Sequence, residues 1–170
     1  HSNPLIFHNS NVLICPFEDN NSTSEEKVLT TRVKKWQQKF LEDFWVSLGS
    51  TPKTFPIRQH DLFFAGISHF PHLISYCLTL VLSRSTYSKE SLHTYGGGLR
   101  DTTRIAGASP ELWMDIILDN KEEIIKLLGQ WTACWEEITT SIHNSDKERL
   151  KHLLGEASSW RNKLEKNNTK

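Results

Sequence analysis

The pattern of apolar and polar positions changes near residue 60. Before it, the short apolar run from Val12 to Cys15 predicts a buried strand, because it stops at a proline and is too short for a helix. Apolar residues then recur every three or four positions until Gly49, which predicts an amphipathic helix with one apolar face: Leu29, Val33, Trp36, Phe40 and Phe44. Residues 52–57 predict a second short strand. Strand, helix and strand together make one βαβ unit.

Beyond residue 60 the pattern is helical almost to the end of the chain. Asp61 is a candidate N-cap for an apolar helix over residues 62–82. Pro71 lies inside this helix and should kink it, because proline removes one helical hydrogen bond. Residues 85–98 predict a loop.

Two further helices carry apolar seams. Ser109 followed by Pro110 predicts a helix start, and Ser145 predicts the start of the last helix. In both helices the apolar positions step alternately by three and four residues: Ile124, Leu128, Trp131, Trp135, Ile138 and Ile142, then Leu150, Leu153, Ala157, Trp160 and Leu164. A small bundle hides so much aromatic surface poorly, so we expect a homodimer through the helices between residues 110 and 164.

Composition and charge exclude several classes of partner. In 170 residues, 20 Lys and Arg balance 20 Asp and Glu, so we expect no nucleic acid and no membrane surface as partner. The longest apolar stretch, residues 73–82, is shorter than the roughly 20 residues of a membrane span. No secretion signal opens the sequence, and three widely spaced cysteines suit buried thiols: Cys15, Cys77 and Cys134. We therefore expect a cytoplasmic protein.

The first candidate site is the run Ser68-His69-Phe70-Pro71-His72, which places two imidazoles three positions apart on an apolar helix. Histidine is the usual acid, base or hydrogen-bond donor near neutral pH. The simpler interpretation is a pair of hydrogen-bonded histidines where Pro71 leaves a carbonyl without its helical donor. A zinc site would need a third ligand or a cysteine pair nearby, and since neither follows in the sequence we expect no metal.

The second candidate site begins with three consecutive glycines at Gly96. Such a run lets the backbone approach a ligand closely. Arg100 and Arg104 share a helical face beyond it, and a guanidinium binds carboxylates bidentately. Alternatively this is a turn in which an arginine pairs with Asp101 or Asp115, and the residue types alone leave the two interpretations even. The glycines are not a dinucleotide fingerprint, because no G-x-G-x-x-G occurs in the chain.

Both candidate sites lie in segments that resemble the prephenate and arogenate dehydrogenase family of tyrosine biosynthesis. The run from Gly96 to Lys121, GGGLRDTTRIAGASPELWMDIILDNK, is similar to that family's GG-[GF]-x-D-x-T-R-I-A segment with the D/S-P-x-x-W-x-D-I stretch and N-K pair that follow it. SHFPH at residues 68–72 resembles the family's S-H-L-P-H helix. PLIFHNSNVLICP at residues 4–16 resembles the last part of its nucleotide-binding domain. The resemblance covers about residues 4–160.

The resemblance implies a mainly α fold in two parts. Residues 60–170 would be a helical substrate-binding and dimerisation domain similar to the C-terminal domain of 6-phosphogluconate dehydrogenase. Residues 1–59 would be the C-terminal remnant of a Rossmann nucleotide-binding domain, a truncated βαβ segment. The implied reaction is an oxidative decarboxylation: NAD or NADP takes a hydride from the ring carbon that bears the hydroxyl, carbon dioxide leaves, and the ring becomes aromatic.

The resemblance also assigns roles by position. Arg104 matches the arginine that grips a carboxylate of the dicarboxylate substrate, and His72 matches a catalytic histidine on the substrate side. Three further residues would line the same pocket: His69, Gly96 and Gly97. Trp113 matches a substrate-site aromatic residue near the dimer interface, although a tryptophan at a helix start is more often a core residue.

Three features of the family are missing from the sequence: its glycine-rich cofactor fingerprint, its acidic ribose-binding residue and its H-P-x-x-G histidine. The cofactor-binding residues are therefore unknown, His1 is left unassigned, and we expect the chain alone to be inactive while it supplies the substrate-binding and dimerisation half. One alternative is a non-catalytic relative that serves as a ligand-binding or assembly module. Another is a helical interaction protein whose Arg and His residues are structural.

Overall fold

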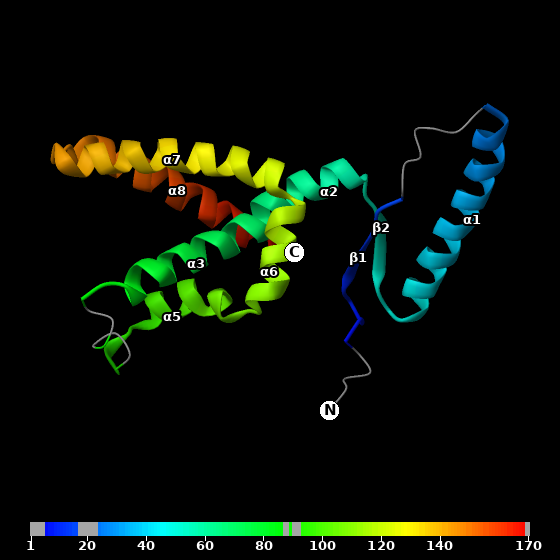
Figure 1. Cartoon of the computed structure of the whole chain (residues 1–170), viewed down its shortest axis with the longest axis horizontal. Helices are drawn as coiled ribbons and strands as arrows, with labels where there is room; N and C mark the ends of the chain where they lie inside the picture. Colours follow the sequence, from blue (N-terminus) through cyan, green and yellow to red (C-terminus); the bar gives the residue numbers. More distant parts are fainter. Residues whose placement is uncertain (1–5, 17–23, 87–88, 90–92, 169–170) are drawn as a thin grey trace. The chain divides into compact units, whose positions relative to one another are not determined.

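The structure, a computed structural model, describes residues 6–16, 24–86, 89 and 93–168. These residues form two compact units, one that ends at Gly107 and one that begins at Ala108, and each is described by itself. The fold is mainly helical, with one small parallel sheet in the first unit, so the expected fold class is confirmed (Figure 1).

The first unit opens with the predicted βαβ unit. Strand β1 (Asn11–Ile14) pairs in parallel with β2 (Thr51–Thr54), and helix α1 (Ser24–Ser47) connects them. Gly49 ends the helical region with φ of 82°, in the left-handed region that favours glycine. A Cβ on this residue would lie 2.8 Å from Cδ2 of His8, so the close approach of the chain also requires a glycine.

The apolar face predicted for α1 is not the face that meets the strands. Gln38 Nε2 donates a hydrogen bond of 2.6 Å to Thr54 Oγ1, so a polar side of the helix lies over β2. The described members of the apolar face are between 46% and 67% exposed: Trp36, Phe40 and Phe44. The side chains of Leu29 and Val33 lie outside the described residues. A sheet of two strands is too narrow to cover a second side of the helix.

The apolar helical stretch consists of three consecutive segments: α2 (Ile57–Phe64), the π-helical η1 (Ala65–His69) and α3 (Phe70–Ser83). The expected start at Asp61 is wrong, because the helix begins four residues earlier, after Pro56, whose φ of −60° suits a helix start. The irregularity expected at Pro71 takes the form of the π-helical segment just before it. A proline has no N–H for the preceding turn, and a wider turn removes the need for one.

By length and composition alone, the helical stretch Ile57–Ser83 could cross a membrane, since its mean hydropathy reaches 1.3 over 18 residues. The sequence expectation considered only residues 73–82 and missed this longer window. The test is weak evidence for a membrane span, because core helices of water-soluble proteins also pass it.

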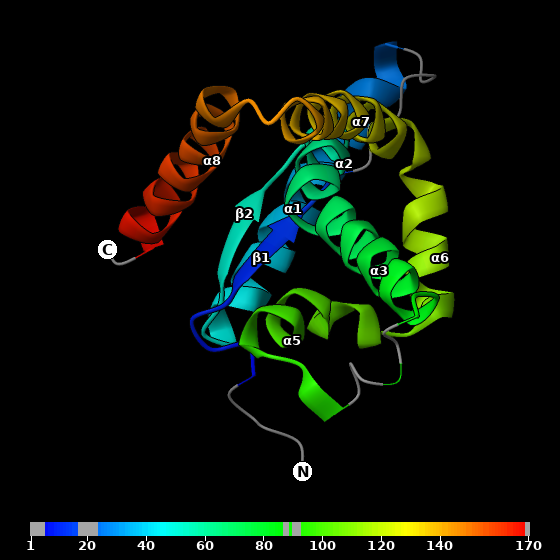
Figure 2. The same ribbon diagram turned by 90° about the vertical axis from the view of Figure 1, so that its left-hand side faces the viewer.

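The glycine run begins a helix, where a loop to residue 98 was expected. Gly96 is the N-cap of α5 (Gly97–Thr103), which passes directly into the 3-10 helix η2 (Arg104–Gly107). Both segments pack against α3 (Figure 2). The two candidate sites therefore lie on elements that contact one another within the first unit.

The described part of the second unit contains three helices: α6 (Pro110–Asp119), α7 (Lys121–His143) and α8 (Lys147–Asn168). The predicted helix start at Ser109 is confirmed, because its Oγ accepts a hydrogen bond of 3.3 Å from the N–H of Leu112. Helices α7 and α8 pack against each other as a hairpin (Figure 1).

The predicted cap of the last helix is wrong by one residue. Ser145 adopts φ of 52°, which is not the extended conformation of an N-cap. Asp146 caps α8 instead, since its Oδ1 accepts a hydrogen bond of 3.0 Å from the N–H of Arg149. The side chain of Arg149 also forms a salt bridge with Glu137 of α7 and so fastens the corner of the hairpin.

The apolar seams of α7 and α8 are largely uncovered in the single chain. Trp131, Trp135 and Trp160 are 39%, 58% and 63% exposed, although the first two stack with ring centroids 6.0 Å apart. Ile124 at the start of the α7 seam is buried. Most of the predicted seam surface is therefore available to a partner.

The three cysteines are not the buried thiols that we expected. Cys77 and Cys134 are exposed, and Cys15 is half-buried. Apolar neighbours in the sequence do not determine which side of a helix a thiol faces, which explains the error for the two helical residues.

Replacing Asp146 by Ala should lower the free energy of unfolding by about 1 kcal/mol, because it removes the acceptor at the start of α8. Urea unfolding followed by circular dichroism measures this change. The matched control is Ser145→Ala, which should change the free energy by less than half as much. The opposite order would show that Ser145 is the cap after all.

Candidate functional site

His72, in the first turn of α3, has a defined hydrogen bond on one ring nitrogen. Its Nδ1 lies 2.9 Å from the carbonyl oxygen of Ser68 in η1. A carbonyl oxygen can only accept, so Nδ1 carries the hydrogen and Nε2 of the neutral ring carries the lone pair. This bond matches the simpler interpretation of a hydrogen-bonded histidine.

His69 ends the π-helical segment and is half-buried. Burial lowers the pKa of His69, and the positive charges of protonated His60 and His72 lower it further, while Asp61 acts in the opposite direction. The ring centroid of Phe64 lies 4.5 Å from that of His60 and 6.5 Å from that of His69. His69 is therefore uncharged near pH 7, where its ring can form hydrogen bonds but does not carry a positive charge.

Arg104 is the first residue of η2, and its side chain is exposed. It forms no salt bridge with any residue that the structure describes. The alternative interpretation expected an arginine paired with an aspartate. Arg100 forms such a pair, because its Nε lies 3.4 Å from Oδ1 of Asp101. Both members of that pair are well exposed, so it contributes little to stability. The guanidinium of Arg104 is thus available to an anionic ligand.

Gly96 and Gly97 lie at the start of α5, close in sequence to Arg104. A Cβ built on Gly96 or Gly97 would have no atom of the described chain within 4 Å. Packing within the chain therefore does not require glycine here, and the space beside this backbone is open. The open space is compatible with a ligand that approaches the backbone, which is the role the resemblance implies.

Trp113 lies on α6 of the second unit and is 8% exposed. Its burial fits the interpretation as a core residue. The role of Trp113 near a substrate site stays a prediction.

The sequence pattern did not single out Ser75, although this residue links the two candidate segments. It is 2% exposed and its Oγ donates a hydrogen bond of 2.8 Å to the carbonyl oxygen of Thr102 in α5. The sequence did contain one sign of its importance, since Ser75 is a polar residue in the middle of an apolar helix, three residues after His72. A buried hydroxyl in such a place needs a partner.

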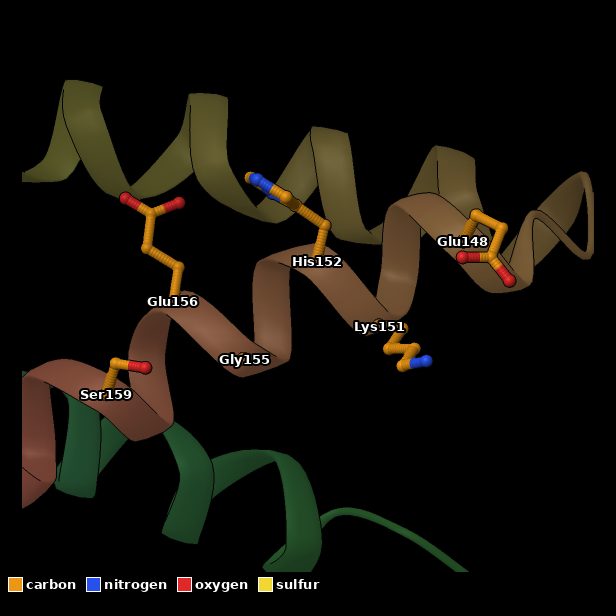
Figure 3. A pocket seen from close by; sticks show the side chains of 6 residues that line it. All are labelled: Glu148, Lys151, His152, Gly155, Glu156 and Ser159. Carbon is orange, nitrogen blue, oxygen red and sulfur yellow. The ribbon is translucent and has the colours of Figure 1, made fainter.

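A surface hollow of about 760 Å³ lies along α8, away in sequence from every predicted site residue. It is lined by six exposed residues of that helix: Glu148, Lys151, His152, Gly155, Glu156 and Ser159. Figure 3 shows His152 and Glu156 on one side of the helix and Lys151 on the other. These mixed charges on a single exposed helix do not converge on a ligand position. Elsewhere among the described residues, no three His, Cys, Asp or Glu side chains are grouped so as to hold a metal ion.

Comparison with known proteins identifies the matching segments. The family model described as "Prephenate dehydrogenase, dimerization domain" matches residues 56–156. Prephenate dehydrogenase of Bacillus subtilis is 34% identical over 112 residues, which are 63% of this chain and 29% of that protein. Cyclohexadienyl dehydrogenase of Zymomonas mobilis is 31% identical over 115 residues, which are 65% of this chain and 39% of that protein.

A solved structure shows the same fold over more of the chain. Prephenate dehydrogenase from A. aeolicus, in complex with hydroxyphenyl propionate and NAD⁺, superposes with a TM-score of 0.66 and 26% identity. The match covers 91% of this chain and 50% of that one. The chain thus spans between about a third and half of the length of these relatives. Because the family model covers more than half of the residues, the chain belongs to the prephenate dehydrogenase family, as a member that carries its dimerization domain.

Proposed function

We propose that this chain supplies the substrate-binding and dimerisation half of a prephenate or arogenate dehydrogenase, an enzyme of tyrosine biosynthesis that performs an NAD(P)-dependent oxidative decarboxylation. The observation that carries the proposal is Arg104, which forms no salt bridge with the described residues and stands on a segment packed against the histidine-bearing helix α3. The names of the relatives support the same reaction class.

In this proposal each residue has a limited task. Arg104 binds a carboxylate of the small dicarboxylate substrate through its planar guanidinium. His72 acts on the substrate side, with its ring orientation held by the bond from Nδ1 to the carbonyl of Ser68. His69 stays neutral beside it, so that Arg104 provides the positive charge for the carboxylate. The open backbone at Gly96 and Gly97 lets the substrate approach closely.

The cofactor NAD or NADP would supply the hydride acceptor when bound. The residues of this chain do not fit a dinucleotide cradle: no glycine lies between β1 and α1, where a phosphate-binding turn of a βαβ unit would need one. No residue of this chain is therefore assigned to the cofactor, and the proposal confines this chain to binding and orienting the substrate.

The division between the Rossmann remnant, residues 1–59, and the helical domain, residues 60–170, is part of the proposal. The start of the family-model match at residue 56 supports it, whereas the packing contacts divide the chain at Gly107. A cytoplasmic location belongs to the same proposal. So does the expectation of no nucleic-acid or membrane partner, which the balanced charge supports. The alternative is a non-catalytic relative that binds the ligand or assembles with a partner but does not turn it over.

The exposed seams of α7 and α8 lead us to expect a homodimer of about 39 kDa, twice the 19.6 kDa of one chain. Sedimentation at micromolar concentration measures it. Trp135→Glu should shift the protein toward the monomer, because it places a charge in the seam. The neighbouring Glu136→Ala should leave the dimer intact, and a wild-type chain that sediments near 20 kDa would contradict the expectation.

Arg104→Ala should weaken prephenate binding by roughly ten- to a hundredfold, since a charge-assisted hydrogen-bonded pair contributes roughly 1.5 to 3 kcal/mol. Isothermal titration calorimetry on the full chain measures the affinity, and thermal unfolding measures stability. Arg100→Ala is the matched control and should change neither quantity, because its salt bridge is exposed. A loss of stability without a loss of affinity in Arg104→Ala would refute the assignment.

The lowered pKa of His69 makes the folded state less stable in mild acid. The unfolded chain takes up the proton at about pH 6.5, whereas the folded chain resists it to lower pH. The free energy of unfolding should therefore fall as the pH drops from 7 toward about 5, and His69→Gln should flatten this dependence. Urea titrations at several pH values test it, with exposed His152→Gln as control. An unchanged pH profile in His69→Gln would disprove the effect.

A further inference from the structure

We infer that Ser75 is a positioning residue, which holds the segment that carries Arg104 at a fixed place against the helix that carries His72. The inference rests on the proposed function, since it concerns the same substrate site. Ser75 itself is not placed in contact with the substrate.

The hydrogen bond of Ser75 differs from those of other helical hydroxyls in this chain. Several of these donate to the carbonyl four residues back in their own helix: Thr79, Thr102, Thr103 and Ser141. That local bond links nothing beyond one turn. Ser75 instead reaches a carbonyl 27 residues away in sequence, at 2.8 Å, from a position that is 2% exposed. Its hydroxyl is thus used to join two segments.

The acceptor of this bond lies where the backbone changes its geometry. Thr102 is in the last turn of α5, two residues before Arg104, the first residue of η2. Carbonyl groups in the last turn of a helix lack a helical donor. The Ser75 hydroxyl donates to the Thr102 carbonyl from another helix, at the point where α5 passes into the 3-10 helix.

The donor lies close to the candidate histidine. Ser75 follows His72 by three residues, so the two side chains share one side of α3 about one turn apart. Figures 1 and 2 both show α3 beside α5, in agreement with the contacts between them. One buried hydrogen bond therefore fixes the backbone of Arg104 relative to that of His72.

Such a bond affects binding because a bidentate carboxylate contact depends on geometry. A small displacement of a positioned group can remove a large part of the binding or catalysis to which it contributes. Without the hydroxyl, α5 and η2 would still lie against α3, but Arg104 would sample more positions. Loss of Ser75 should therefore act through Arg104 and leave the rest of the fold in place.

The test is a double-mutant cycle on prephenate binding by the full chain. Ser75→Ala should weaken binding three- to tenfold, and Ser75→Ala combined with Arg104→Ala should bind no more weakly than Arg104→Ala alone. Ser75→Cys keeps the size of the side chain with a weaker donor, so it should fall between wild type and Ser75→Ala, and it serves as the well-packed variant. Ser83→Ala removes an exposed hydroxyl of the same helix and should bind like wild type.

The outcomes separate this inference from the proposed function. Wild-type affinity in Ser75→Ala and Ser75→Cys, even with a lowered melting temperature, would overturn the positioning role and leave the function standing. Effects of Ser75→Ala and Arg104→Ala that multiply in the double variant would also overturn it. A wild-type chain that does not bind prephenate, or an Arg104→Ala variant that binds it normally, would refute the proposed function and the inference with it.

Discussion

This chain has more apolar surface than its own packing covers, and both units therefore expose large apolar side chains. Among the described residues, the buried apolar side chains are few: Ile14, Ala65, Trp113 and Ile124. The aromatic side of α1 is exposed because the sheet beneath it has only two strands. The seams of α7 and α8 are exposed because a hairpin of two helices covers one side of each helix at most. Large exposed apolar surfaces of this kind are typical of sites that another structure covers.

Within the first unit, polar groups rather than apolar packing determine the local geometry of the candidate site. Pro71 has no N–H to donate and follows a π-helical turn, and the carbonyl of Ser68 in that turn accepts a hydrogen bond from His72 Nδ1. The hydroxyl of Ser75 joins the same helix to the end of α5. Both bonds involve backbone carbonyls, so the site depends on the exact course of the backbone and less on the identity of the surrounding apolar residues.

The sequence predicts most of the elements but fewer of their boundaries. Periodicity identifies the βαβ unit and the long helices, and Ser109 marks its helix correctly because a hydroxyl before Pro110 has one dominant structural use. Asp61 failed as a cap because the helix begins after Pro56, where no side chain caps it. Ser145 failed because the neighbouring Asp146 can serve equally well, and only the backbone dihedrals decide between them. Ser75 was missed since its partner is 27 residues away, and no local pattern contains that information.

The same imbalance bears on how the candidate site would work. Arg104 and the glycines beside it are exposed in the single chain, where water weakens the attraction between a guanidinium and a carboxylate. The attraction strengthens when apolar surface excludes the water, and the first unit itself exposes large apolar side chains, among them Leu62, Phe63 and Ile67. The hydrogen bonds of His72 and Ser75 already hold the polar groups of this unit in place before any ligand arrives. Within the first unit, covering this apolar surface and strengthening the charged contact would be favoured by the same removal of water.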